Sequence, residues 1–268
     1  MKLAAIDLDG TLLNSQHRLL EENTQALRQA QAQGVQLVLA TGRSVVSAVD
    51  MLEQMELEGF ILALNGTFIA QKTSEGLKTL RSSQLEHSDV KKAFALAQEE
   101  KITFIASNQL GSDRVVMDDP EELVQEFLVK RTDLRYFTAK EMQEKIDDTR
   151  NHYLKLAFTN QNRNKLLSLK QRLEKAGLPT IFSDTHYIEY VPQGANKGTA
   201  LQFLCEKLGI SLSETLAIGD QENDIELLQM SGRGIAMGNA QEHVKAVADQ
   251  VTATNDQAGV AKALLRYL

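Results

Sequence analysis

The sequence predicts an α/β protein in which a parallel sheet with crossover helices is interrupted by a separate α+β unit. At both ends of the chain, short apolar runs alternate with helical segments, as in parallel sheets whose strands are joined by helices. Between about residues 82 and 191, strands come in pairs between helices. Paired strands favour a largely antiparallel sheet, so we expect a second unit of about 110 residues inserted into the first.

Each element of the parallel-sheet unit is predicted from a short apolar run or an amphipathic segment. The expected strands are 2–6, 35–40, 60–64, 67–70, 215–218, 234–237 and 250–253. The expected helices are 21–33, 44–55, 199–208, 224–230, 241–248 and 259–268. Residues 1–81 and 192–268 are therefore expected to form one domain.

The inserted unit, 82–191, is expected to contain four helices and six strands. The helices are predicted at 89–100, 121–130, 139–145 and 162–176. The strands are predicted at 102–107, 114–117, 134–137, 153–159, 180–183 and 187–191. Because the strands are interleaved with helices in pairs, the predicted class is α+β.

Composition and charge exclude several classes of protein. The 268-residue chain has 29 Lys and Arg against 36 Asp and Glu, a net charge of −7, which argues against sequence-independent nucleic-acid binding. Its single cysteine, Cys205, excludes an intramolecular disulfide framework and a cysteine-rich zinc site. No apolar run is long enough to span a membrane. In the absence of a targeting signal, we expect a cytoplasmic protein without membrane partners.

Two carboxylates, Asp7 and Asp9, directly follow the first predicted strand and precede a turn-forming glycine, Gly10. In parallel α/β sheets, ligands bind beyond the carboxyl ends of the strands, and this spacing can direct both carboxylates there. One could act as nucleophile and metal ligand and the other as general acid and base. The alternative is an ordinary acidic turn, which the position after the first strand disfavours.

A second acidic motif follows the strand 215–218. Asp220, Asn223 and Asp224 are spaced three and four residues apart, which would place them on one face of the helix that begins there. Oxygen ligands at the start of a helix suit Mg²⁺, a hard cation. The alternative is a helix cap, because aspartate is a good N-cap residue.

Three further positions have a structural and a functional interpretation. Thr41 and Gly42 follow the second strand and form either a phosphate seat or a simple N-cap region. Lys197 is either a solvated surface charge or the cation that a phosphoryl site with several carboxylates needs. Asn65-Gly66 favours a type I′ hairpin turn over a ligand role.

The order of these motifs closely resembles that of the haloacid dehalogenase-like superfamily. The shared pattern is Asp-Leu-Asp-Gly-Thr after the first strand, Thr-Gly-Arg after the second, a loop lysine, and then Gly-Asp-x-x-Asn-Asp. The segment 234–240 and the long insertion resemble the Cof-type sugar-phosphatase branch, which has a large type IIB cap. The resemblance covers essentially the whole chain. It implies a Rossmann-like parallel-sheet core with an inserted α+β cap domain.

The resemblance also implies catalytic and metal-binding roles. Asp7 would attack phosphorus and form an aspartyl-phosphate, and Asp9 would serve first as acid and then as base. Mg²⁺ would be held by the Asp7 carboxylate, the main-chain carbonyl of Asp9 and Asp220. Asp224 would be either a direct ligand or a neighbour of the ligands.

The same resemblance implies a set of groups that bind the phosphoryl oxygens. They are Thr41, Gly42, Lys197, the Leu8 amide and Asn223. We therefore expect a Mg²⁺-dependent phosphatase of small phosphorylated metabolites, with sugar phosphates favoured. The alternatives are a phosphomutase of the same superfamily and a non-catalytic phospholigand-binding module, which the presence of Asp7 and Asp9 disfavours. The substrate, the oligomeric state and the cap residues that set specificity are left open.

Overall fold

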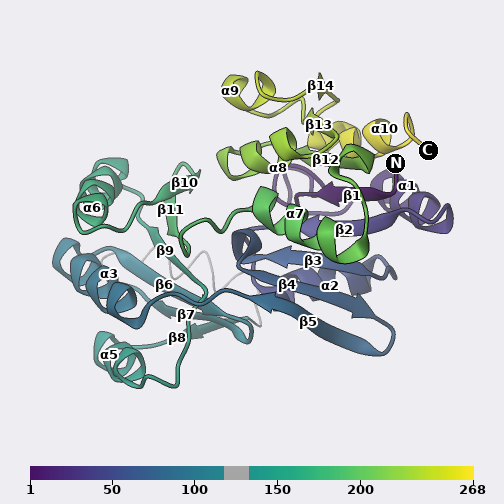
Figure 1. Ribbon diagram of the computed structural model, residues 1–268. Coiled ribbons are helices and arrows are strands. Elements are labelled where there is room, and N and C mark those ends of the chain that lie inside the picture. Colours follow the sequence, from purple (N-terminus) through teal and green to yellow (C-terminus); the bar gives the residue numbers. More distant parts are fainter. Residues whose placement is uncertain (118–132) are drawn as a thin grey trace. The chain divides into compact units, whose positions relative to one another are not determined.

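The computed structural model describes residues 1–117 and 133–268, and it divides into two compact units (Figure 1). The first consists of Met1–Arg43, Ser47–Ser82 and Gly194–Leu268. The second consists of Ser44–Val46 and Ser83–Gln193. The helix predicted at 121–130 lies outside the described residues. Among the residues described, no helix is long and apolar enough to cross a membrane.

The first unit is built on an eight-stranded sheet with the order β14-β13-β12-β1-β2-β3-β4-β5. Its strands are β1 (Leu3–Ile6), β2 (Gln36–Ala40), β3 (Gly59–Ala63), β4 (Phe68–Thr73), β5 (Gly76–Ser82), β12 (Thr215–Gly219), β13 (Arg233–Ala236) and β14 (Gln250–Val251). All neighbouring strands from β14 to β3 are parallel, and β4 and β5 add an antiparallel edge. The predicted α/β class is confirmed, and β5 is an additional strand that the sequence did not indicate.

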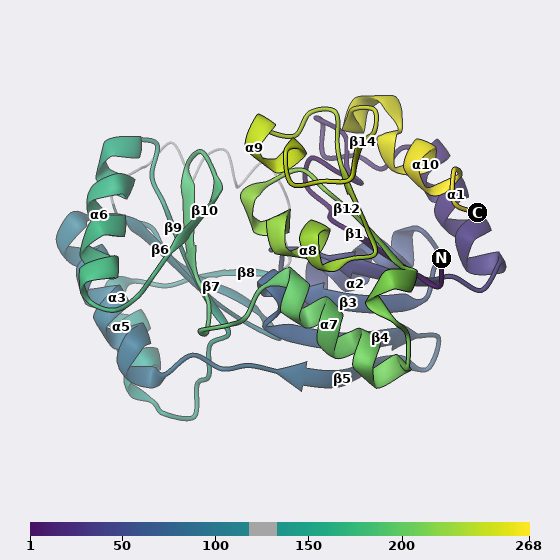
Figure 2. The ribbon, with the colours of Figure 1, turned by 45° about the horizontal axis from the view of Figure 1, so that its top comes forward.

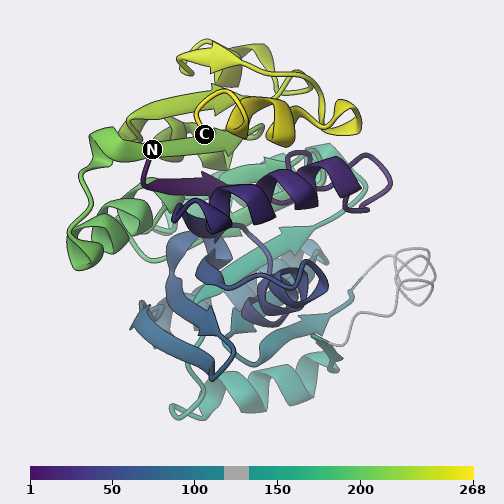
Figure 3. The same cartoon turned by 90° about the vertical axis from the view of Figure 1, so that its right-hand side faces the viewer.

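Helices cover both faces of this sheet, which explains why its central strands are apolar throughout. The helices are α1 (Glu21–Ala32), α2 (Val45–Gln54), α7 (Lys197–Leu208), α8 (Ile225–Met230), α9 (Glu242–Lys245) and α10 (Gly259–Leu264). Leu3 and Ala5 of β1 pack in one cluster with Leu201 and Leu204 of α7. On the other face, α1 and α10 lie side by side (Figure 3). Every residue of β1 is therefore buried.

The second unit is a six-stranded sheet with the order β10-β11-β9-β6-β7-β8. Its strands are β6 (Thr103–Asn108), β7 (Gly111–Val115), β8 (Leu134–Tyr136), β9 (Lys155–Thr159), β10 (Ile181–Asp184) and β11 (Tyr187–Tyr190). All pairs are antiparallel except β7 with β8, as the strand pairs predicted. In the described part of this unit, the helices α3 (His87–Glu100), α5 (Ala139–Asp147) and α6 (Arg163–Lys175) cover one face (Figure 2).

The core of the second unit is centred on three phenylalanines. The Phe104 ring lies 4.9 Å from that of Phe94 and 5.7 Å from that of Phe158, measured between ring centroids. Tilted and edge-on pairs at these distances place the positive ring edge against the negative face, which adds to the hydrophobic gain. The helices α3, α5 and α6 therefore pack against one shared aromatic core.

The topology of the first unit brings several loops together at one edge of the sheet. Because β1, β2, β3 and β12 run parallel, the segments that follow them all emerge at their carboxyl ends. The segment after β3 differs from the expected two-residue turn, since Ala63 pairs with Phe68 and four residues connect the strands. Of these, Leu64, Asn65 and Gly66 all have positive φ angles. Asn65 and Gly66 have the φ angles of the predicted type I′ turn, and the Thr67 N–H donates to the Leu64 carbonyl at 3.5 Å, so the turn is present within this longer connection.

Candidate active site

Asp7 occupies the first position after the central strand β1. Its backbone N–H donates to the Ile218 carbonyl at 3.0 Å, so the sheet ladder holds the residue in place. The residue is 4% exposed, and one carboxylate oxygen accepts a hydrogen bond of 2.7 Å from Lys197 Nζ. Burial and the neighbouring Asp224 carboxylate raise the pKa of Asp7 well above its usual value, in spite of the opposing charge of Lys197.

Lys197 is the first residue of α7 rather than the loop residue that the sequence suggested. Asn196 caps this helix by accepting a hydrogen bond of 2.7 Å from the Thr199 N–H. The Lys197 ammonium is buried and donates to Asp7 and Asp224, each at 2.7 Å. Burial alone would lower the pKa of Lys197, but the Asp224 and Asp7 carboxylates raise it above its usual value. The lysine is therefore a fixed positive charge.

The segment after β12 supplies two further buried carboxylates, Asp220 and Asp224. They do not lie on one face of a helix as expected, because α8 begins only at Ile225 and residues 222–224 form a 3₁₀ turn. One Asp224 oxygen accepts from Lys197, and the other accepts from the backbone N–H groups of Asp220 and Gln221 at 2.9 and 3.1 Å. The tight turn thus directs Asp224 toward Asp7.

Asp220 is held on the other side of the cluster by the segment after β1. One of its oxygens accepts a hydrogen bond of 2.8 Å from the Thr11 hydroxyl. At Gly10, whose φ is 76°, a Cβ atom would lie 2.3 Å from an Asp220 oxygen. A side chain at position 10 would therefore collide with the carboxylate, and for this reason the motif requires glycine.

The three buried carboxylates have the chemistry of a divalent-cation site. Asp7, Asp220 and Asp224 each present an oxygen, and these oxygens lie within 4.8 Å of one another. Burial and the Asp224 charge raise the pKa of Asp220 to about 7. Three carboxylates and one lysine leave excess negative charge in a buried place, and hard oxygen ligands suit Mg²⁺. The residues present therefore fit this metal.

Asp9 points to a different partner from Asp7. Arg43 Nε and Nη2 donate to its two carboxylate oxygens at 2.7 and 2.5 Å, and His17 Nδ1 lies 3.5 Å from one of them. Burial would raise the pKa of Asp9, but the hydrogen bonds and charge of Arg43 outweigh it and hold the pKa below its usual value. Asp9 is thus ionised in this arrangement.

The predicted phosphate-binding residues lie at the same sheet edge. Thr41 directly follows β2, is fully buried, and accepts a hydrogen bond of 3.0 Å from the Arg43 N–H through its hydroxyl. Leu8 is buried between Asp7 and Asp9. Asn223 donates from Nδ2 to the Asn65 side-chain oxygen at 3.1 Å.

Three contact residues were missed as members of the site. Arg43 and Thr11 lie inside recognisable sequence motifs, but nothing in their spacing predicts a role for either residue. Asn65 was read as a turn residue. Its place in the sequence indicates a site residue, because Asn65 follows a predicted parallel strand just as Asp7 and Thr41 do.

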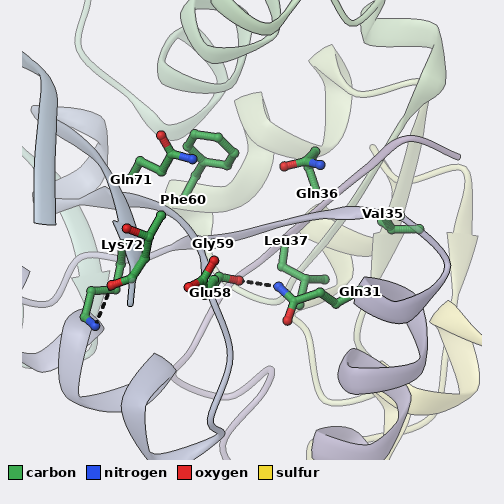
Figure 4. A pocket seen from close by; sticks show the side chains of 11 residues that line it. Gln31, Val35, Gln36, Leu37, Glu58, Gly59, Phe60, Gln71 and Lys72 are labelled. Carbon is green, nitrogen blue, oxygen red and sulfur yellow. Dashed lines mark hydrogen bonds between the residues drawn. The ribbon is translucent and has the colours of Figure 1, made fainter. Parts of the chain in front are cut away.

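A hollow lies at the opposite edge of the sheet. This cavity of about 230 Å³ forms where β2 and β3 begin (Figure 4). Its polar groups bind one another: Gln31 Nε2 donates to the Glu58 carbonyl at 2.6 Å, and Lys72 Nζ contacts Glu53 and the Thr73 carbonyl, each at 3.2 Å. The carboxylate cluster, by contrast, lies at the carboxyl edge, where ligands of parallel sheets bind.

Comparison with known proteins identifies the family of this chain. A family model described as haloacid dehalogenase-like hydrolase matches residues 4–264. The chain is 34% identical to the phosphatase YwpJ of Bacillus subtilis, with 100% of both chains covered. It is 33% identical to the 5-amino-6-(5-phospho-D-ribitylamino)uracil phosphatase YcsE of the same species, with 100% of this chain and 96% of that protein covered. A solved haloacid dehalogenase-like hydrolase from B. subtilis superimposes with a TM-score of 0.89 at 30% identity, and 100% of both chains is covered. This chain therefore belongs to the haloacid dehalogenase-like hydrolases, as its motifs predicted.

Proposed function

We propose that this protein is a Mg²⁺-dependent phosphatase that hydrolyses small phosphorylated metabolites, sugar phosphates in particular, through an aspartyl-phosphate on Asp7. The family and the phosphatases among its relatives support a phosphatase. The observation that carries the mechanism is the buried Asp7 carboxylate, held at the end of the central strand beside Lys197 and two further carboxylates. A nucleophile there meets a substrate at the carboxyl edge of the sheet.

In the first step, an Asp7 oxygen attacks phosphorus and the ester oxygen leaves. Lys197 offsets negative charge on the nucleophile and on the phosphoryl oxygens. Asp7, Asp220 and the main-chain carbonyl of Asp9 would hold Mg²⁺, which when bound lets an anionic phosphoryl group approach a carboxylate. Both Asp224 oxygens already accept hydrogen bonds, so we assign Asp224 to orienting Lys197 and the loop.

Asp9 exchanges protons in both steps. With Arg43 on both oxygens it is ionised, which is the form that a base needs to take a proton from the hydrolytic water in the second step. To protonate the leaving oxygen in the first step, Asp9 must separate from Arg43 and carry a proton. Asp9 therefore has to change partners during each turnover.

The transferred phosphoryl group needs donors around its remaining oxygens. We assign this role to Thr41, Gly42, the Leu8 amide, Lys197 and Asn223. Thr41 follows β2 and Asn223 follows β12, and these two strands flank β1 in the sheet. Because both segments emerge at the same edge, their donors can converge on one anion. In this proposal, residues 82–191 act as a cap domain that selects the leaving group.

A phosphate-release screen tests the proposal. The purified protein is incubated with Mg²⁺ and sugar phosphates, nucleotides or pyridoxal phosphate, and inorganic phosphate is measured. Release from at least one class, abolished by EDTA, is expected. Conversion of one sugar phosphate into another without net release would instead identify a phosphomutase. Binding without turnover of any ester would identify a phospholigand-binding module.

A further inference from the structure

The segment between β3 and β4 has an unusual backbone for a buried loop. Leu64, Asn65 and Gly66 are consecutive and have φ angles of 52°, 58° and 86°. Leu64 and Asn65 are only 1% and 2% exposed. A bulky residue such as leucine rarely has a positive φ, and such a conformation persists only when the surroundings impose it. The contacts of this loop therefore identify what imposes it.

The loop is attached to the segment that follows β2. The Leu64 N–H donates to the Arg43 carbonyl at 3.1 Å, and the Asn65 N–H donates to the Thr41 carbonyl at 3.0 Å. Both acceptors flank Gly42, so the loop fixes the backbone on either side of a predicted phosphate-binding residue.

The same loop contacts the start of α7. A Cβ atom at Gly66 would lie 2.5 Å from the Asn196 carbonyl and 2.8 Å from the Ala200 Cβ, so only glycine allows this approach. Asn196 caps the helix whose first residue is Lys197. The loop therefore packs directly beside the residue that precedes the buried lysine.

The third contact is made by the Asn65 side chain. Its oxygen accepts a hydrogen bond of 3.1 Å from Asn223 Nδ2, 158 residues away in sequence. An asparagine amide is planar and has two N–H groups on the same nitrogen. Once one of them is committed to Asn65, the direction of the second is set as well.

We propose that Asn65 is a positioning residue of the phosphoryl site: it holds the Asn223 amide so that the second N–H of Asn223 donates to a phosphoryl oxygen. The inference rests on the proposed function. It explains why an asparagine, which tolerates a positive φ, stands at a buried position whose side chain bonds across the site.

A double-mutant cycle tests this role. Asn65→Gly keeps the left-handed backbone accessible and removes the side chain, and Asn223→Ala removes the donor. Each variant is expected to lower kcat/KM for a phosphate ester about tenfold to a hundredfold, because a misplaced donor no longer matches the reacting group. If Asn65 acts through Asn223, the double variant is no worse than Asn223→Ala alone. Losses that multiply in the double variant would overturn the proposal.

Two further variants separate positioning from folding. Asn65→Asp keeps an acceptor oxygen and tolerates a positive φ. Asn223→Ala should therefore lower kcat/KM by the same factor in this background as in the wild type. Lys101→Gly is the matched control, because Lys101 also has a positive φ of 52° but lies in the other unit. It should leave kcat/KM unchanged. If Asn223→Ala costs nothing in the Asn65→Asp background, the side-chain acceptor is not what positions Asn223.

Binding of inorganic phosphate in the presence of Mg²⁺, measured by calorimetry, distinguishes this inference from the proposed function. Wild-type protein that neither binds phosphate nor hydrolyses any ester would contradict the proposed function itself. Active wild-type protein with an additive cycle would contradict only the role of Asn65. Weaker phosphate binding by Asn65→Gly, and binding by the double variant that is no weaker than by Asn223→Ala alone, is the expected result.

Discussion

Asp7 shows how neighbouring charges decide what a buried carboxylate can do. Burial and Asp224 raise its pKa, whereas Lys197, at 2.7 Å, favours the ionised form that a nucleophile needs. The pKa of Asp9, two residues away, is shifted in the opposite direction, because Arg43 outweighs the effect of burial and lowers it. Two aspartates of one short motif thus have different proton affinities, as expected when one is a nucleophile and the other exchanges protons.

Asp7→Asn is expected to abolish turnover. An amide matches the carboxylate in shape but cannot attack phosphorus to form an acyl phosphate, so the rate should fall by about three orders of magnitude or more. Phosphate release over long incubations measures the residual rate. Asp147→Asn, which changes an exposed carboxylate on α5, is the matched control and should keep wild-type activity. Retention of more than about a tenth of the rate in Asp7→Asn would identify another nucleophile.

Cys205 should be unreactive in the folded protein near neutral pH. The thiol is buried in α7, and burial together with the Glu206 charge raises its pKa to about 11. Reaction with a disulfide thiol reagent at pH 8 should therefore be slow until urea unfolds the protein. The folded pKa lies above the ordinary thiol value of about 8.5, so the stability contributed by the neutral thiol is complete below that pH. It is lost as the pH rises through about 11. Rapid labelling of native protein at pH 8 would contradict this.

At the scale of elements, a buried carboxylate helps to hold the second unit together, in addition to the aromatic core. Asp113 of β7 is fully buried, accepts hydrogen bonds from Arg135 Nε at 2.6 Å and Tyr153 Oη at 2.8 Å, and forms an ion pair with Lys145 Nζ at 2.8 Å. These partners come from β8, from the segment before β9 and from α5. Burial and the Asp113 charge raise the pKa of the Tyr153 hydroxyl, which keeps it a donor.

Asp113→Ala should destabilise the second unit strongly. The substitution leaves two cations and a buried hydroxyl without their shared acceptor, which costs about 3 kcal/mol or more. Urea denaturation followed by circular dichroism measures the effect. Glu174→Ala on α6 is the control, because an exposed ion pair to Lys170 contributes about 0.5 kcal/mol or less. Equal unfolding midpoints for the two variants would show that the network is not a stabilising element.

The elements also show which features a sequence can predict. The strand β1 was predictable because both faces of the sheet are covered, so every residue from Leu3 to Ile6 is apolar. The edge strand β5 is largely exposed and has no such pattern. The role of Asn65 was not predictable either, because its backbone is imposed by neighbours and its partner Asn223 is distant in sequence. Motif residues at strand ends could be placed at one edge, but their hydrogen-bond partners could not.

At the scale of the whole molecule, negative charge is in excess, and the same excess is found in the buried carboxylate cluster. The chain carries a net charge of −7. Buried charges matter more for stability than exposed ones, because the interior screens them less. In the carboxylate cluster of the first unit, Asp7, Asp220 and Asp224 face the single cation of Lys197. The raised pKa values of Asp7 and Asp220 show that their ionised forms are disfavoured without a further cation.

Mg²⁺ should therefore stabilise the folded protein as well as activate it. A cation that binds only the folded state adds about 2.7 kcal/mol at a concentration one hundred times its Kd. For a chain of this size we expect Tm to rise by about 5 °C or more. Scanning calorimetry with increasing Mg²⁺ measures the shift. Asp220→Asn should reduce the rise in Tm, because the variant loses a ligand charge, whereas Asp147→Asn should not.

Ca²⁺ should also stabilise the folded protein but support little turnover, because its larger and looser coordination shell misplaces the Asp7 carboxylate and the phosphoryl oxygens. An unchanged Tm at saturating Mg²⁺, together with full activity in EDTA after exhaustive dialysis, would show that the acidic cluster functions without a divalent cation.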